Sequence, residues 1–147
     1  MKIYVDGACS VNPGPGGAAA LVIHDTGFED EVCLAVNPTT NQRMEIKAVI
    51  IGLEKALMAE PNWVDVYSDS ANVVNCFNQS WYKNWEKNGW LNSKKEPVAN
   101  RDLWERLLAL YRQFTCPVIF NKVKGHSGDE YNERVDKLAV AARLEVE

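Results

Sequence analysis

Hydrophobic and polar side chains alternate along the first residues of the chain. Over residues 2–9, "KIYVDGAC", this alternation predicts a β-strand, and the Pro- and Gly-rich "SVNPGPGG" at 10–17 predicts a turn. Apolar runs at 18–24, "AAALVIH", and at 31–36, "EVCLAV", predict two more strands. The short "DTGFED" between them permits a hairpin. The chain is therefore expected to begin with three strands joined by short connections.

A long helix is predicted by "TTNQRMEIKAVIIGLEKAL", residues 39–57, in which apolar residues recur at helical spacing, and it should end before Pro61. The later elements are predicted from the periodicities of strands and helices. Strands are expected at 63–68 and 117–123. Helices are expected at 70–79, after the Trp-rich segment up to about Phe114, and at about 130–144.

The order of these elements predicts an α/β fold with one mixed sheet. Hairpins early in the chain and helical crossovers later imply antiparallel strands followed by parallel strands, with helices covering the sheet. A right-handed crossover through the helix at 39–57 can place the strand at 63–68 beside the first strand and parallel to it. The length of 147 residues suggests a single domain.

Composition narrows the class of protein only slightly. The formal net charge of −4 is not typical of nucleic-acid-binding proteins, which are usually basic. The four cysteines are widely spaced and form no CxxC pair, which favours free thiols in a reducing cytoplasm over a zinc site or disulfides. No apolar run is long enough to span a membrane, and the N-terminus lacks the apolar stretch of a secretion signal. A cytoplasmic monomer, with no obligate protein partner, is the default expectation.

Glu45 occupies an unusual position in the predicted helix at 39–57. At about 100° per residue, its neighbours on the same face are apolar: Ala48, Val49, Gly52, Leu53 and Ala56. This face should meet the sheet, and an unpaired carboxylate is costly to bury. Glu45 therefore needs a partner in the fold.

Three further acids are candidates for the same place. The predicted topology puts Asp6, on the first strand, near Asp69, at the end of the neighbouring parallel strand, and Asp136 flanks an apolar stripe in the last helix. Two carboxylates about 5 Å apart repel by roughly 3 kcal/mol at an effective dielectric of 20. A divalent metal would relieve this repulsion, and a site of oxygen ligands alone favours Mg²⁺ or Mn²⁺ over zinc.

Ordinary structural roles compete with the metal site. Asp69 precedes a predicted helix and is a candidate N-cap, Asp6 precedes a glycine and is a candidate turn residue, and Asp136 is a candidate solvated flank. Periodicity and topology alone leave these alternatives open.

These residues resemble those of the type 1 ribonucleases H. Five segments occur in that family's order across nearly the whole chain: "YVDGACSVNPGPGG", "TTNQRMEIKAVIIGLE", "VYSDSANVV", the Trp-rich segment and "VKGHSGDEYNERVDKLA". The resemblance implies a ribonuclease H-like fold, with a five-stranded mixed sheet of three antiparallel and then two parallel strands. It implies one catalytic domain over residues 1–147, with a protrusion at about 81–104. It also implies cleavage of the RNA strand of RNA–DNA hybrids with two Mg²⁺ ions, for which Mn²⁺ may substitute, giving 5′-phosphate and 3′-hydroxyl ends.

The resemblance assigns roles residue by residue. Asp6, Glu45, Asp69 and Asp136 match the family's metal-binding acids, and His126 matches its catalytic histidine, suited to proton transfer or help with product release. The matches to substrate-binding positions are Cys9, Asn12, Asn41 and Gln42 along the minor groove, Thr40 and Asn100 in a pocket for a DNA-strand phosphate, and Trp81 and Trp85 in a channel for the DNA strand. Turn and cap chemistry is the alternative for Asn12 and Asn41, a small local core is the alternative for the tryptophans, and an exposed loop residue is the alternative for His126.

The chain departs from the family pattern in three places. Pro38 stands where bacterial members often have an arginine that binds phosphate, and Ala71 stands where they often have a glutamine. The protrusion has five basic and three acidic side chains, a net charge of only +2. We therefore expect catalysis with a weakened affinity for the hybrid.

Three rival functions remain. A non-catalytic hybrid-binding module would usually lack one of the four acids, and all four are present. A resolvase or integrase core would differ in its motifs, and "TTNQRME" with "VKGH" argues against both. Nothing in the sequence speaks specifically for a phosphate-binding scaffold protein.

Overall fold

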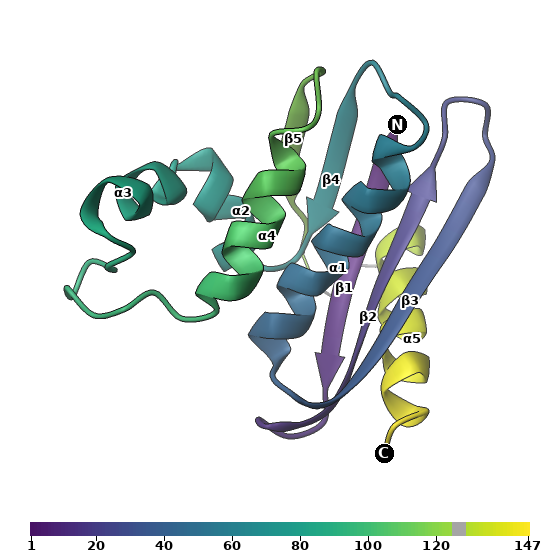
Figure 1. The fold of residues 1–147 in the computed structure, drawn as a ribbon. Coiled ribbons are helices and arrows are strands. Elements are labelled where there is room, and N and C mark those ends of the chain that lie inside the picture. Colours follow the sequence, from purple (N-terminus) through teal and green to yellow (C-terminus); the bar gives the residue numbers. More distant parts are fainter. Residues whose placement is uncertain (125–128) are drawn as a thin grey trace.

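Five strands form one mixed sheet in the order β3-β2-β1-β4-β5 (Figure 1). The computed structural model describes residues 1–124 and 129–147. The strands are β1 (Lys2–Cys9), β2 (Gly14–Ile23), β3 (Glu29–Thr39), β4 (Val64–Ser68) and β5 (Val118–Lys122). β2 runs antiparallel to both β1 and β3, whereas β4 runs parallel to β1, and β5 runs parallel to β4. The predicted fold class is confirmed, including the crossover that places β4 beside β1.

Helices cover both faces of the sheet. They are α1 (Asn41–Leu57), α2 (Ala71–Asn78), α3 (Trp81–Asn88), α4 (Arg101–Tyr111) and α5 (Glu130–Leu144). α1 packs on β1 and β2 and contacts α4, whereas α5 lies on the opposite face of the sheet (Figure 1). In the described part of the chain, no helix is both long enough and apolar enough to cross a bilayer.

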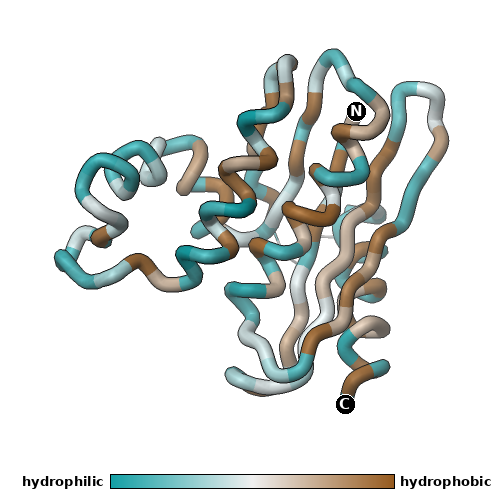
Figure 2. The backbone as a smooth tube through the Cα atoms, in the orientation of Figure 1, coloured by the Kyte–Doolittle hydropathy of each residue, from teal (hydrophilic) through white to brown (hydrophobic). Residues whose placement is uncertain are grey.

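The apolar face predicted for α1 is the centre of the main core. Ala48, Val49 and Leu53 are fully buried and belong to the same cluster as Ile3 and Val5 of β1. Hydrophobic stretches run along the strands of the sheet, while hydrophilic positions dominate the protrusion around α3 (Figure 2). Burial of this continuous apolar surface is the main term that holds α1 against the sheet.

Glycines in β2 let a helix approach the sheet backbone closely. The turn predicted over residues 10–17 is wrong for its second half, because β2 already begins at Gly14. A Cβ atom added to Gly17 would lie 2.6 Å from the backbone nitrogen of Arg143 in α5, closer than side-chain carbons pack. Here glycine serves close packing within a strand rather than a turn.

Tryptophans hold the protrusion together. The ring centroid of Trp85 lies 5.7 Å from that of Trp90 and 5.5 Å from that of Trp104. Trp90 and Trp104 are buried, whereas Trp81 and Trp85 remain half-exposed. Of Trp81, Trp85 and Trp90, for which a local core is the alternative, Trp90 is therefore a core residue, and the buried Trp104 belongs to the same cluster.

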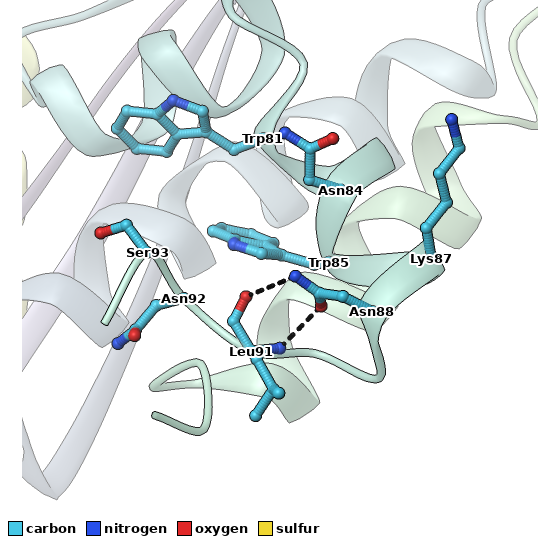
Figure 3. Close-up of a pocket in the computed structure, with 8 residues that line it drawn as sticks. All are labelled: Trp81, Asn84, Trp85, Lys87, Asn88, Leu91, Asn92 and Ser93. Atoms are coloured by element: carbon cyan, nitrogen blue, oxygen red, sulfur yellow. Dashed lines mark hydrogen bonds between the residues drawn. The ribbon is translucent and has the colours of Figure 1, made fainter. Parts of the chain in front are cut away.

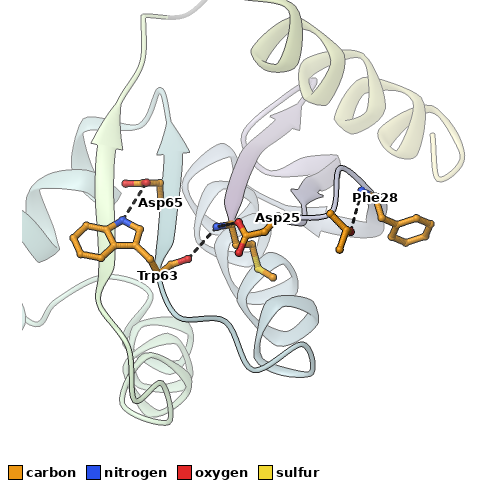
Figure 4. Close-up of polar contacts among 6 residues, drawn as sticks. Asp25, Phe28, Trp63 and Asp65 are labelled. Atoms are coloured by element: carbon orange, nitrogen blue, oxygen red, sulfur yellow. Dashed lines mark hydrogen bonds and ion pairs between the residues drawn. The ribbon is translucent and has the colours of Figure 1, made fainter.

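Polar contacts fasten the amino-terminal end of β1 (Figure 4). The amino group of Met1 donates to Asp25 Oδ1 at 2.9 Å and to the carbonyl oxygen of Trp63 at 3.1 Å. Asp65 accepts from Trp63 Nε1 at 3.1 Å. Asp25 and Asp65, at this end of the sheet, therefore each accept a hydrogen bond.

We predict that Gly17→Ala weakens the packing of α5 on β2. The added methyl group has no room between the strand and the helix, and such overpacking typically costs about 1–3 kcal/mol. Urea unfolding should show a lower midpoint with an unchanged slope. Ala141→Ser is the control, because it adds one heavy atom at an exposed position of the same helix. A Gly17→Ala loss no larger than that of Ala141→Ser would contradict the tight contact.

Candidate active site

Asp6 lies in the middle of β1 and is only 7% exposed. One of its carboxylate oxygens, Oδ1, accepts a hydrogen bond from the backbone N–H of Gly7 at 2.9 Å. Burial, the negative charge of Asp69 and the contact with Asp136 raise the pKa of Asp6 to about 8. The carboxyl group is therefore mostly protonated at neutral pH without a cation. Asp6 is a buried strand residue, so the interpretation as a turn former is wrong.

The start of α1 comes very close to β1 beside this acid. A Cβ atom added to Gly7 would lie 2.6 Å from the backbone nitrogen of Glu45. Burial raises the pKa of Glu45, the nearby Ser70 hydroxyl opposes this rise, and the charge of Asp69 adds to it. Glu45 thus meets the acids of the sheet, as its place on the apolar face of α1 suggested.

Asp69 connects β4 to α2 but does not cap the helix. Ser70 is the N-cap, and its Oγ accepts from the backbone N–H of Val73 at 3.3 Å. Ser68 Oγ in turn accepts from the backbone N–H of Ser70 at 3.1 Å. The capping alternative for Asp69 is therefore wrong, and its carboxylate is left to act on Asp6 and Glu45.

Asp136 reaches the same place from the other face of the sheet. It is half-buried on α5, the helix that packs on β2 and β1, and its side chain interacts with Asp6. This contact makes the interpretation as a purely solvated flank wrong. The carboxyl group of Asp6 therefore interacts both with Asp69, which follows β4, and with Asp136 of α5.

The four acids suit a hard divalent cation, although they do not form a finished cage. Their donors are all carboxylate oxygens, which Mg²⁺ and Mn²⁺ prefer. Within residues 1–124 and 129–147, no Lys or Arg forms an ion pair with any of them. Within the same residues, no group of three or more His, Cys, Asp or Glu side chains is already arranged to hold an ion. The negative charge of these carboxylates is thus not balanced by a basic side chain in the described residues. A bound cation would draw the carboxylates closer together.

Several of the predicted substrate residues gather where β1 ends and α1 begins. Asn12 Oδ1 accepts from the backbone N–H of Asn41 at 2.9 Å, so Asn12 also helps to cap α1. Cys9 Sγ donates to the carbonyl oxygens of Val11 and Thr39. Gln42 is exposed next to them on α1.

Of the remaining predicted substrate residues, Thr40 and Asn100 directly precede α1 and α4, and Trp81 and Trp85 belong to α3. Trp81 and Trp85 line a pocket of about 630 Å³ together with Asn84 and Asn88, and both indole rings face it (Figure 3). Asn88 holds one wall of this pocket by hydrogen bonds to the backbone of Leu91. The prediction for His126 lies outside the described residues.

Two residues near the site, Ser70 and Arg43, are not among those predicted from the sequence. Ser70 interacts with Glu45, and its position directly after Asp69 and before a predicted helix was the available signal. Arg43 contacts both Asn100 and Asp102, and no sequence pattern announces a contact between residues so far apart.

Comparisons with known proteins agree with this geometry. A family model described as RNase H matches residues 1–143. The Ribonuclease H of Syntrophomonas wolfei subsp. wolfei is 52% identical over 137 residues, which cover 93% of this chain and 91% of that protein. The Ribonuclease HI of Synechocystis sp. is 44% identical over 142 residues, covering 97% of this chain and 86% of that protein.

Solved structures show the same fold. LC9-RNase H1 superposes with a TM-score of 0.83 at 25% identity, covering 99% of this chain and 72% of that one. LC11-RNase H1, solved in complex with an RNA/DNA hybrid, has a TM-score of 0.75 at 23% identity, covering 98% of this chain and 96% of that one.

We predict that the metal-free protein loses stability as the pH rises from about 4 to about 8. The ordinary pKa of Asp6 is 3.8 and its folded value is about 8, so in this window unfolding releases a proton and is favoured by rising pH. Each unit of this difference is worth about 1.4 kcal/mol. Asp6→Asn cannot ionise and should flatten the slope, measured as the melting temperature in EDTA at several pH values.

The control for this experiment is Glu60→Gln, which removes an exposed carboxylate outside the site. It should keep the pH slope of the unmodified protein. An Asp6→Asn protein with the same slope as that control would contradict the buried, protonated Asp6.

Proposed function

Because this chain belongs to the RNase H family, we propose that it cleaves the RNA strand of RNA–DNA hybrids, leaving 5′-phosphate and 3′-hydroxyl ends. The observation that carries the proposal is the approach of Asp69 and Asp136 to the buried Asp6. A related fold that was solved with an RNA/DNA hybrid supports the choice of substrate.

Asp6, Glu45, Asp69 and Asp136 would hold two Mg²⁺ ions through their carboxylate oxygens, and Mn²⁺ could replace Mg²⁺. When bound, such ions supply an activated water and charge stabilisation at the phosphate. Asp6 must give up its proton when a cation binds, because a carboxyl with a pKa of about 8 is mostly neutral at pH 7. Metal affinity should therefore fall as the pH is lowered. His126 is assigned proton transfer or help with product release.

The hybrid is recognised by shape more than by sequence. Cys9, Asn12, Asn41 and Gln42 lie where the exposed end of β1 meets α1, and they are assigned to the minor groove, which displays the 2′-hydroxyls of the RNA strand. Thr40 and Asn100 are assigned to a DNA-strand phosphate. Trp81 and Trp85, which line the pocket on α3, are assigned to a channel for the DNA strand.

We propose that residues 1–147 act as one catalytic domain without an obligate protein partner, and that the protein works as a monomer in the cytoplasm. All four cysteines are free, which suits a reducing compartment.

The first test separates catalysis from hybrid binding alone. A labelled RNA–DNA hybrid should be cut in Mg²⁺ but not in EDTA, while duplex RNA and duplex DNA should stay intact. Asp69→Asn should lower the cleavage rate by more than about 100-fold, because losing a metal ligand should cost more than losing an outer residue of a metal site, which typically costs about 10–100-fold. It should also raise metal-free stability by roughly 1 kcal/mol or more, because it removes charge repulsion.

Glu60→Gln is the matched control for Asp69→Asn, because it changes the net charge equally at an exposed position outside the site. It should keep full cleavage. Hybrid binding without any cleavage would point instead to the non-catalytic module, and an Asp69→Asn protein that melts earlier in EDTA would contradict the clustered acids.

The second test concerns the missing arginine. Pro38 is exposed at the end of β3, two residues before Thr40. Pro38→Arg should lower the Michaelis constant for the hybrid, because a guanidinium can bind a phosphate through two hydrogen bonds. Gln113→Arg adds the same charge beyond the end of α4 and is the control. Equal Michaelis constants for Pro38→Arg and the unmodified protein would refute this explanation.

A further inference from the structure

Arg43 links the two halves of the phosphate pocket assigned to Thr40 and Asn100. Its backbone N–H donates to Thr40 Oγ1 at 3.2 Å, at the start of α1. Its side chain donates from Nη1 to Asn100 Oδ1 at 3.3 Å, although these two residues are 57 positions apart in the sequence. One residue in the first turn of α1 therefore contacts both proposed phosphate ligands.

The guanidinium of Arg43 is held by Asp102. Nη1 donates to Asp102 Oδ1 at 3.0 Å, and Nη2 donates to Asp102 Oδ2 at 2.8 Å. This paired geometry fixes the plane of the guanidinium as well as its position. It also neutralises the charge of Arg43, which makes Arg43 a poor direct ligand for a phosphate.

These contacts determine which atoms of Asn100 and Thr40 remain available. A guanidinium has only donors, so the Asn100 amide must turn its oxygen toward Arg43 and its Nδ2 away. Asn100 precedes α4 with φ 62° and ψ 30°, and its side chain makes no capping hydrogen bond. Thr40 Oγ1 also accepts from Arg43, which leaves its hydroxyl hydrogen free to donate. Both groups thus keep donors for an anion, but only Asn100 depends on the Arg43 side chain, because Thr40 accepts from the backbone N–H of residue 43.

We propose that Arg43, clamped by Asp102, is a positioning residue that aims the Nδ2 donor of Asn100 at the phosphate of the DNA strand to which Thr40 is also assigned. This role rests on the proposed function and deepens it. On this proposal, the Arg43–Asp102 ion pair influences binding of the phosphate without itself contacting the substrate.

Two other roles for Arg43 give different results. If Arg43 only tethered α4 to α1, loss of another ion pair between the same helices, Arg106 Nη2 with Glu54 Oε1 at 3.4 Å, would have the same effect. If Arg43 bound the phosphate directly, Asp102→Asn would free its charge and tighten binding.

Steady-state cleavage of an RNA–DNA hybrid tests the proposal. Arg43→Ala should raise the Michaelis constant roughly five- to tenfold with little change in kcat, the size expected for the loss of one or two charge-assisted contacts. Asp102→Asn should raise it in the same direction. Arg43→Lys should resemble Arg43→Ala, because an ammonium cannot hold Asp102 and Asn100 in the same fork. Arg106→Ala should leave both constants unchanged.

A second measurement locates the effect. One phosphate of the DNA strand is replaced by a neutral methylphosphonate, at the linkage where this change lowers the affinity of the unmodified protein most. The same change should lower the affinity of the Arg43→Ala protein much less. Equal weakening of both proteins would overturn the proposal, as would a lower Michaelis constant in Asp102→Asn, an Arg43→Lys protein like the unmodified one, or an Arg106→Ala effect equal to that of Arg43→Ala. Should Arg43→Ala fail to fold, Asp102→Asn, which keeps the side-chain shape, carries the test. Cleavage by the unmodified protein tests the nuclease function itself, so the two failures are distinguishable.

Discussion

The burial of the Asp6 carboxyl group is the constraint on which the rest of the structure depends. Folding removes most of its water and brings the charges of Asp69 and Asp136 near it, which is why its pKa rises to about 8. Close packing is needed to achieve this. Gly7 lets the first turn of α1 reach β1, and Gly17 lets α5 rest on the backbone of β2. Side chains at these two positions would push the acid-bearing helices away from the sheet.

Most of the fold around Asp6 could be predicted from the sequence, because it follows from the periodicity of apolar residues and from the rules that govern connections between strands. Glu45 could be placed toward the sheet because its neighbours one helical turn away are apolar, and Asp69 could be placed near Asp6 because crossovers are right-handed. The turn predicted over residues 10–17 failed in its second half because Pro and Gly punctuate turns in most sequences, whereas Gly16 and Gly17 here permit close packing inside β2. The capping role considered for Asp69 belongs to its neighbour Ser70, and adjacent polar residues give no sequence signal that separates them.

Contacts between side chains that are far apart in the sequence could not be predicted from the sequence. The contacts of Arg43 with Asn100 and Asp102 depend on how α1 meets α4, and no local pattern encodes that meeting. The roles given to Thr40, Asn100, Trp81 and Trp85 remain proposals. The tryptophans show why such roles need a structure, because Trp90 and Trp104 are buried in the protrusion while Trp81 and Trp85 face its pocket.

Asp136 resides on α5, the last helix of this sequence, whereas Asp6 belongs to its first strand. A ribosome therefore makes Asp6 well before Asp136. Until α5 has emerged and settled over β2, the nascent polypeptide has only part of its acidic cluster. The order of synthesis thus delays completion of the cluster until α5 has been made.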